Sequence, residues 1–171
     1  MPAAYQTRSF LMRRFEEVGV SPKTRHGQNF LIDTNLLRLL HRSAGLGPED
    51  VVLEVGTGTG SLTALMAADA AAVVTVEIDA HLFQLAREEL AEFDNVTMLR
   101  TDALKNKNTL NPEVLAAVRE RLEASPSRRF KLAANLPYNI ATPIITNALA
   151  CESPPESMTI TIQKELADRI L

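Results

Sequence analysis

The 171-residue sequence contains one cysteine, Cys151, no tryptophan and only 5% aromatic residues. A single cysteine excludes an intramolecular disulfide framework and fits a reducing cytoplasm. Besides it there are only three histidines, so no His and Cys cluster of the kind that ligates metals is present, and we expect no metal. The remaining composition, 46% apolar and 23% charged, indicates a globular protein rather than a disordered, collagen-like or coiled-coil chain.

A long apolar run and an apolar leader are also missing. Charged side chains interrupt the first twenty residues, where a signal peptide would need an apolar core. The uncharged stretch 132–151 contains two prolines and three asparagines, so it predicts a loop and a helix rather than a membrane span. We therefore expect one soluble, cytoplasmic domain, a monomer that does not associate with membranes.

Neither sign of charge dominates, since the net charge is −3, and this does not indicate a nucleic-acid-binding protein. Basic residues are nevertheless concentrated in two segments. Residues 1–26 and residues 119–131 each carry five basic and two acidic side chains. Both segments are candidate contacts for phosphate groups, with ordinary solvated surface charge as the alternative.

From residue 50 onward, short β-branched or apolar runs alternate with helical patterns. The predicted strands cover 51–55, 73–77, 96–99, 130–134 and 158–162, and the predicted helices begin at 61, after Asp79, after Asn111 and at 141. This alternation predicts an α/β fold, a doubly wound and mostly parallel sheet with helices on both faces. A basic helix at 5–18, an irregular segment at 19–29 and a leucine-rich helix at 33–41 predict a helical extension up to about residue 45.

Three alternating glycines follow the first predicted strand, in the segment Glu54-Val55-Gly56-Thr57-Gly58-Thr59-Gly60. They allow a sharp turn and the close approach of a ligand at the carboxyl edge of the sheet. Ser61 stands where the dinucleotide-binding fingerprint requires a glycine, which argues against a dehydrogenase. The alternative is an ordinary tight turn between a strand and a helix.

Carboxylates follow the next two predicted strands, Glu77 before Ile78 and Asp102 before Ala103. An ionised carboxylate has two acceptor oxygens, so Glu77 can accept both hydroxyls of a ribose, and Asp102 can accept an adenine amine. With Glu54 they predict three acidic groups, which favour a cationic adenosine derivative and repel a diphosphate. S-adenosylmethionine fits this description. Taken singly, each strand-end carboxylate is also explained as a helix cap.

The turn Asn135-Leu136-Pro137-Tyr138 follows the fourth predicted strand. The Asn135 side-chain oxygen and the Leu136 carbonyl can accept the two hydrogens of a base amine, which orients its lone pair toward a methyl donor. Pro137 stiffens the turn, and Tyr138 offers a flat face for stacking an extruded base. The alternative is a strand-ending turn capped by asparagine.

These residues resemble the ribosomal RNA adenine dimethyltransferases. The matching segments are Gly27-Gln28-Asn29-Phe30-Leu31, Glu54 to Gly60, Val76-Glu77-Ile78-Asp79, Thr101-Asp102-Ala103-Leu104, Asn135 to Thr142 and Gln163-Lys164-Glu165. The resemblance implies cofactor contacts at Gln28, Asn29, Leu31, Gly56, Gly58, Glu77, Ile78, Asp102, Ala103 and Asn135. It implies catalytic roles for Asn135, Leu136, Pro137 and Tyr138.

The resemblance implies transfer of methyl groups from S-adenosylmethionine to N6 of two adjacent adenines in small-subunit (16S) ribosomal RNA, in a pre-30S particle. A resistance-type methylase of large-subunit RNA and a non-catalytic RNA-binding assembly factor are the alternatives. Members of the family continue into further strands and a helical domain. We therefore expect residues 1–171 to form a catalytic domain whose sheet is truncated at its C-terminal end, without the C-terminal helical domain. The segment between 104 and 130 is longer and more charged than the family leads us to expect.

Overall fold

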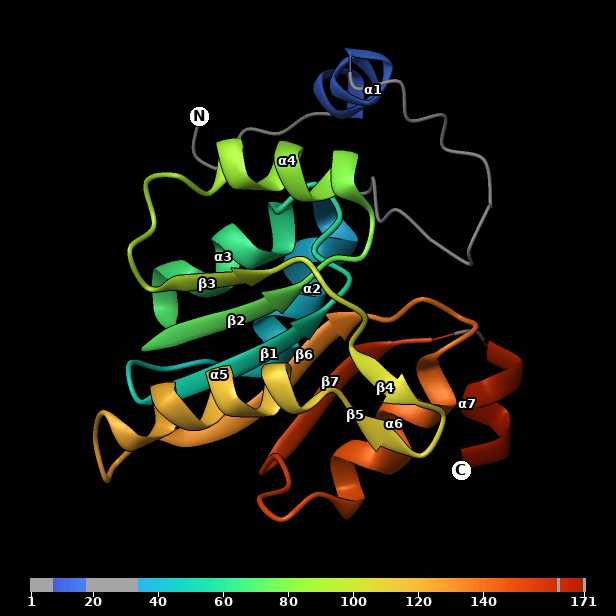
Figure 1. Cartoon of the computed structure of the whole chain (residues 1–171). Helices are drawn as coiled ribbons and strands as arrows, with labels where there is room; N and C mark the ends of the chain where they lie inside the picture. The colour runs from blue at the N-terminus through green and yellow to red at the C-terminus, as the bar shows by residue number, and fades with distance from the viewer. Residues whose placement is uncertain (1–7, 18–33, 163, 171) are drawn as a thin grey trace.

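The computed structural model describes residues 8–17, 34–162 and 164–170. At its centre lies a five-stranded sheet in the order β3-β2-β1-β6-β7, in which all neighbouring strands are parallel (Figure 1). The strands are β1 (Asp50–Val55), β2 (Ala72–Val76), β3 (Val96–Leu99), β6 (Arg129–Asn135) and β7 (Ser157–Thr161). The predicted parallel sheet is confirmed.

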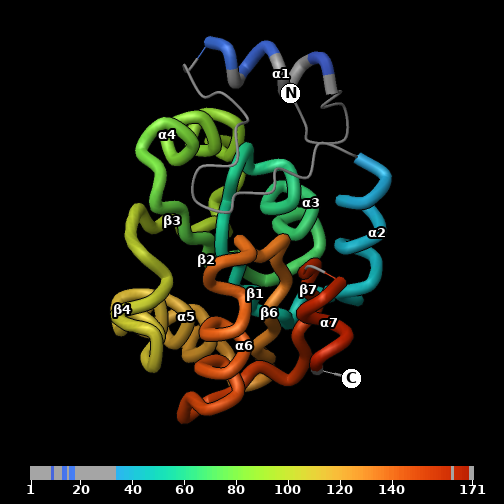
Figure 2. Tube along the Cα trace, turned by 90° about the vertical axis from the view of Figure 1, so that its right-hand side faces the viewer, coloured from blue at the N-terminus to red at the C-terminus, as the bar shows by residue number. Residues whose placement is uncertain are grey.

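Helices cover both faces of the sheet, as Figure 2 shows in a view onto the carboxyl ends of the strands. One face carries α2 (Thr34–Ala44) and α3 (Ser61–Asp69), and α4 (Ala80–Glu89) packs beside α3. The other face carries α5 (Pro112–Glu123) and α6 (Ala141–Ala150). Along β1 the side chains alternate between these layers, since Val51 and Leu53 belong to the α5–α6 core and Val52 to the α2–α3 core. The sheet is therefore doubly wound.

Local sequence signals set the ends of several helices. The Asp79 carboxylate caps α4 by accepting hydrogen bonds from the amides of His81 and Leu82, at 2.8 and 3.0 Å. Asn111 caps α5 in the same way, and proline occupies the first turn. Gly45 follows α2 with a φ of +53°. The caps at Asp79 and Asn111 confirm two of the predicted helix starts.

One element was not predicted. A two-stranded antiparallel hairpin, β4 (Leu104–Asn106) and β5 (Thr109–Leu110), lies between β3 and α5. In α5 the buried side chains are Val114 and Val118, and Leu115 and Leu122 pack partly buried against the same core. Two further helices are α1 (Arg8–Glu17), before α2, and α7 (Lys164–Ile170), after β7. None of the described helices is long and apolar enough to cross a membrane.

Candidate active site

The turn between β1 and α3 lies beside the Asn135–Tyr138 turn, so two parts of the predicted site are close together. Gly56, Gly58 and Gly60 have φ values of +88°, +57° and +80°, a region that disfavours side chains. A β-carbon added to Gly56 would lie 3.5 Å from Cδ and Cγ of Pro137 and 3.9 Å from the carbonyl oxygen of Asn135. The glycine turn and the asparagine turn therefore form one continuous surface at the carboxyl edge of the sheet.

Glu77, directly after β2, is joined to the same glycine turn. Its Oε2 accepts a hydrogen bond from the amide of Gly58 and its Oε1 one from the amide of Asp79, both at 2.9 Å. The side chain is buried, and this burial raises the pKa of Glu77, an effect that the two amides oppose. Each oxygen keeps a further lone pair for a ligand donor. Ile78, beside it, is 62% exposed, so its side chain is accessible to a ligand at this edge.

The structure corrects the prediction for Glu54. This side chain is only 1% exposed, and its Oε2 accepts hydrogen bonds from the hydroxyls of Thr63 (2.5 Å) and Thr75 (2.7 Å). Burial raises the pKa of Glu54 to about 8, so at neutral pH the group is mostly protonated. Glu54 lies beneath the turn as a hydrogen-bonded core residue and does not add a negative charge to the surface of the site.

Thr57 extends this buried group of hydrogen bonds to the glycine turn. Its hydroxyl lies 2.6 Å from that of Thr75. Since the Thr75 hydroxyl donates its proton to Glu54, it accepts one from Thr57. Glu54 therefore acts on the glycine turn indirectly, by holding Thr75 and through it Thr57.

Asp102 and Ala103 lie between β3 and the β4–β5 hairpin. Asp102 is exposed, and its Oδ1 accepts a hydrogen bond from the amide of Leu104 at 2.9 Å. The side-chain amide of Asn111 donates to the backbone carbonyl of Asp102, also at 2.9 Å. Ala103 is 4% exposed and packs in the core. Asp102 therefore presents a fixed carboxylate at the edge that carries Glu77.

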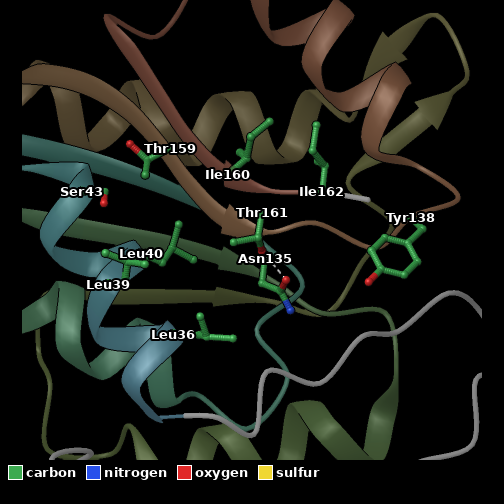
Figure 3. Close-up of a pocket in the computed structure, with 10 residues that line it drawn as sticks. All are labelled: Leu36, Leu39, Leu40, Ser43, Asn135, Tyr138, Thr159, Ile160, Thr161 and Ile162. Carbon is green, nitrogen blue, oxygen red and sulfur yellow. Dashed lines mark hydrogen bonds between the residues drawn. The ribbon is translucent and has the colours of Figure 1, made fainter. Parts of the chain in front are cut away.

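The Asn135–Tyr138 turn differs in one respect from the predicted arrangement. The Oδ1 atom of Asn135 accepts a hydrogen bond from the Thr161 hydroxyl, whose residue is its register partner on β7 (Figure 3). One lone pair of the oxygen that we expected to face a base amine is thus already engaged. The Leu136 side chain is fully buried, so this residue has only backbone groups to offer. Thr161 was missed because no spacing in the sequence links it to Asn135.

A cavity of about 360 Å³ opens beside this turn, between α2 and β7. Asn135 and Tyr138 are among its lining residues, and the walls are mainly apolar (Figure 3). The remaining lining residues are Leu36, Leu39, Leu40, Ser43, Thr159, Ile160, Thr161 and Ile162. Leu36 and Leu39 are about half exposed, at 47% and 51%. The cavity is thus open on its α2 side.

Basic side chains of the segment 119–131 form ion pairs and hydrogen bonds with other residues of the chain. Asp50, fully buried at the start of β1, forms ion pairs of 2.9 Å with Arg129 and with Lys131. Arg121 donates to the Thr97 hydroxyl, and Arg119 lies 3.7 Å from Glu152. The β1 and β6 ends that hold these pairs are opposite the Asn135 turn. The segment is therefore a poor candidate for holding a substrate at the site.

The N-terminal basic segment is described only in part. Arg14 of α1 donates to Glu17 and to Glu88 of α4, at 2.7 and 2.9 Å. Gln28, Asn29 and Leu31 lie outside the described residues. Within the described ranges there is no group of three or more His, Cys, Asp or Glu side chains that could hold a metal ion.

Comparison with known proteins gives one consistent result. Residues 19–171 match the family model for ribosomal RNA adenine dimethylase. The chain is 43% identical over 148 residues to the ribosomal RNA small subunit methyltransferase A of Caldanaerobacter subterraneus subsp. tengcongensis, covering 86% of this chain and 52% of that protein. It is 41% identical over 157 residues to the protein of the same name from Pediococcus pentosaceus, covering 91% and 50%. The chain thus spans about half the length of the curated relatives it matches.

Solved structures show the same fold. The crystal structure of the 23S rRNA methyltransferase ErmE superposes with a TM-score of 0.62 at 29% identity, covering 81% of this chain and 50% of that one. A dimethyladenosine transferase from Plasmodium falciparum has a TM-score of 0.64 at 24% identity, with 81% and 44% covered. The second likeness supports the fold alone.

Proposed function

Because the chain belongs to the ribosomal RNA adenine dimethylase family, we propose that it carries the catalytic machinery for dimethylating N6 of two adjacent adenines in small-subunit ribosomal RNA, in a pre-30S particle. We propose residues 1–171 as the cofactor-binding catalytic domain, with the helices before residue 45 as its extension. One observation carries the proposal. A β-carbon added to Gly56 would lie 3.5 Å from Pro137 and 3.9 Å from the Asn135 carbonyl oxygen, and Glu77 accepts a hydrogen bond from the amide of Gly58. The residues proposed to bind the methyl donor and those proposed to bind the target base therefore lie at one edge of the sheet.

The residues at this edge fit S-adenosylmethionine. The space next to Gly56 would be narrowed by any side chain, and Glu77 is a buried carboxylate whose raised pKa reports a cost of burying its charge. Hydroxyl donors and a nearby positive charge offset that cost. In this assignment Glu77 accepts the ribose hydroxyls, Asp102 accepts the adenine amine, and Ile78 flanks the ring. Ala103, whose side chain is buried in the core, takes part through its backbone. When bound, S-adenosylmethionine supplies an electrophilic methyl group on a positively charged sulfur.

The asparagine turn binds and orients the target base. The Leu136 carbonyl and the second lone pair of the Asn135 oxygen accept the two hydrogens of the amine, so that its lone pair points toward the methyl donor. Pro137 fixes the turn, and Tyr138 stacks on the extruded base beside the apolar cavity. The methylated nitrogen is acidic and loses its proton to water, so no general base is required.

The test is methyl transfer from tritiated S-adenosylmethionine to under-methylated small ribosomal subunits, followed by digestion of the RNA to nucleosides. We expect label in N6,N6-dimethyladenosine and none with Asn135→Ala, although that variant still binds the cofactor in calorimetry. Large subunits, assayed in parallel, test the resistance-type alternative. Label confined to large-subunit RNA, or to a nucleoside other than adenosine, contradicts the proposal.

A further inference from the structure

The β4–β5 hairpin was not predicted, and it lies at the rim of the proposed active site. It follows Asp102 and Ala103 directly and leads into α5. Figure 2 shows it at the carboxyl edge of the sheet, beside α5 and α6. Residues 104–110 include two lysines and no acidic residue, and residues 105–109 are all exposed.

Contacts with the rest of the chain fix this hairpin in place. A ribbon of two short strands is not stable by itself in water. Here Leu110 is buried in the main core, and the Asn147 side chain of α6 donates to the carbonyl of Lys107 at 3.2 Å. At the tip, the Asn106 side chain accepts a hydrogen bond from the amide of Asn108 at 2.9 Å. The hairpin therefore presents its lysines from a defined position.

The charges of the hairpin are available to a partner. Within the described ranges, no side-chain hydrogen bond or ion pair engages Lys105, Lys107 or the nearby Arg100. The basic segment 119–131, by contrast, is engaged within the chain. The acidic group nearest in sequence is Asp102, which accepts the amide of Leu104. Three exposed cations and one carboxylate thus lie within residues 100–107.

We propose that the β4–β5 hairpin binds phosphate groups of the RNA substrate through Lys105 and Lys107. This inference rests on the proposed function, since a base held at the Asn135 turn brings the phosphates of flanking nucleotides to the same edge of the protein. Lysine contacts of this kind position the RNA backbone without reading its sequence. Two ammonium groups on a short exposed ribbon without carboxylates suit that task, because every phosphate contact releases counterions and adds to the salt dependence of binding.

The test compares two double variants of the chain, Lys105→Gln/Lys107→Gln and the control Arg42→Gln/Arg119→Gln. The control removes the same charge elsewhere. Arg42 is exposed in the last turn of α2, and Arg119 forms only an exposed 3.7 Å pair with Glu152. Binding of a fluorescein-labelled RNA stem–loop with adenines in its loop is measured by anisotropy between about 50 and 200 mM KCl.

We expect the lysine variant to reduce the slope of log affinity against log salt by about 2. Its affinity at low salt should fall on the order of tenfold, while the control retains the wild-type slope. Equal slopes in all three proteins, an equal loss in the control, or no RNA binding by the wild-type chain would each overturn the hairpin contact. Calorimetric binding of S-adenosylmethionine is expected to be the same in all three. This measurement tests the proposed function separately. If the wild-type chain does not bind S-adenosylmethionine, the proposed cofactor site is contradicted, whereas the proposed hairpin contact is not.

Discussion

Replacing Glu54 by glutamine tests the assignment of this residue to the core. The amide oxygen of glutamine can still accept the hydroxyls of Thr63 and Thr75, but the side chain no longer titrates. In the wild-type protein, burial raises the pKa of Glu54 from 4.5 to about 8. At a pH between these two pKa values, Glu54 is deprotonated in the unfolded chain and protonated in the folded chain. The free energy of unfolding therefore falls as the pH rises, and the contribution of this group is lost by about pH 8.

The size of the effect follows from the two pKa values. Each pH unit between them costs the folded state about 1.4 kcal/mol. From pH 5 to pH 7.5, the stability of the wild type relative to Glu54→Gln should therefore fall by about 3 kcal/mol. Other titrating groups are common to both proteins and cancel in the difference. A poorer hydrogen bond from the glutamine amide shifts the difference equally at every pH, so only its pH dependence reports the titration.

Urea unfolding of both proteins at several pH values measures this difference. Calorimetry at pH 7.5 adds an independent test, because a core residue outside the pocket leaves the affinity for S-adenosylmethionine within about threefold of the wild type. A stability difference that does not change with pH would refute the buried, protonated state of Glu54. A large loss of cofactor affinity in Glu54→Gln would show that Glu54 takes part in binding the cofactor.

Three further changes have defined outcomes. Glu77→Gln should weaken the binding of S-adenosylmethionine, measured by calorimetry, by about tenfold or more. The NH2 group of glutamine replaces one carboxylate oxygen and then faces a backbone N–H, so two donors oppose each other. Wild-type affinity should in turn fall as the pH drops through the raised pKa of Glu77, and a flat profile would contradict its role. Thr161→Val should slow methyl transfer to small subunits about tenfold, the equivalent of one hydrogen bond, while Thr161→Ser retains the rate. Thr159→Val, on the same face of β7, is the control, and equal rates in the two valine variants would remove Thr161 from the mechanism. Asp50→Asn should lower the free energy of unfolding by about 2 kcal/mol without changing cofactor affinity, because it leaves two cations without their buried partner.

The sequence predicted the large elements of the fold because their signals are local. Runs of valine such as those in β1 and β2 indicate buried parallel strands, and the caps at Asp79 and Asn111 mark helix starts. The β4–β5 hairpin was missed because its strands are too short to show an alternating pattern. Its position depends on a contact from α6, far along the chain.

The candidate site was predicted in its composition and only partly in its geometry. Strand ends gave the placement of Glu77 and Asp102 at one edge, since parallel strands share their carboxyl ends. The direction of the Glu54 side chain is set by packing against α3, which local sequence does not reveal. Likewise, the contact between Asn135 and Thr161 depends on strand register, which only the folded sheet defines.

The position of Gly56 beside Pro137 has a consequence for the distance between the two reacting molecules. β1 and β6 are hydrogen-bonded neighbours, so the turns that follow them are spaced by the sheet itself, whose strands lie about 4.8 Å apart. If the methyl donor binds at one turn and the target amine at the other, the distance between them is set by the folded sheet before either ligand binds. The backbone of the sheet would then set the distance over which the methyl group is transferred, and a side chain at residue 56 would occupy space between the two turns.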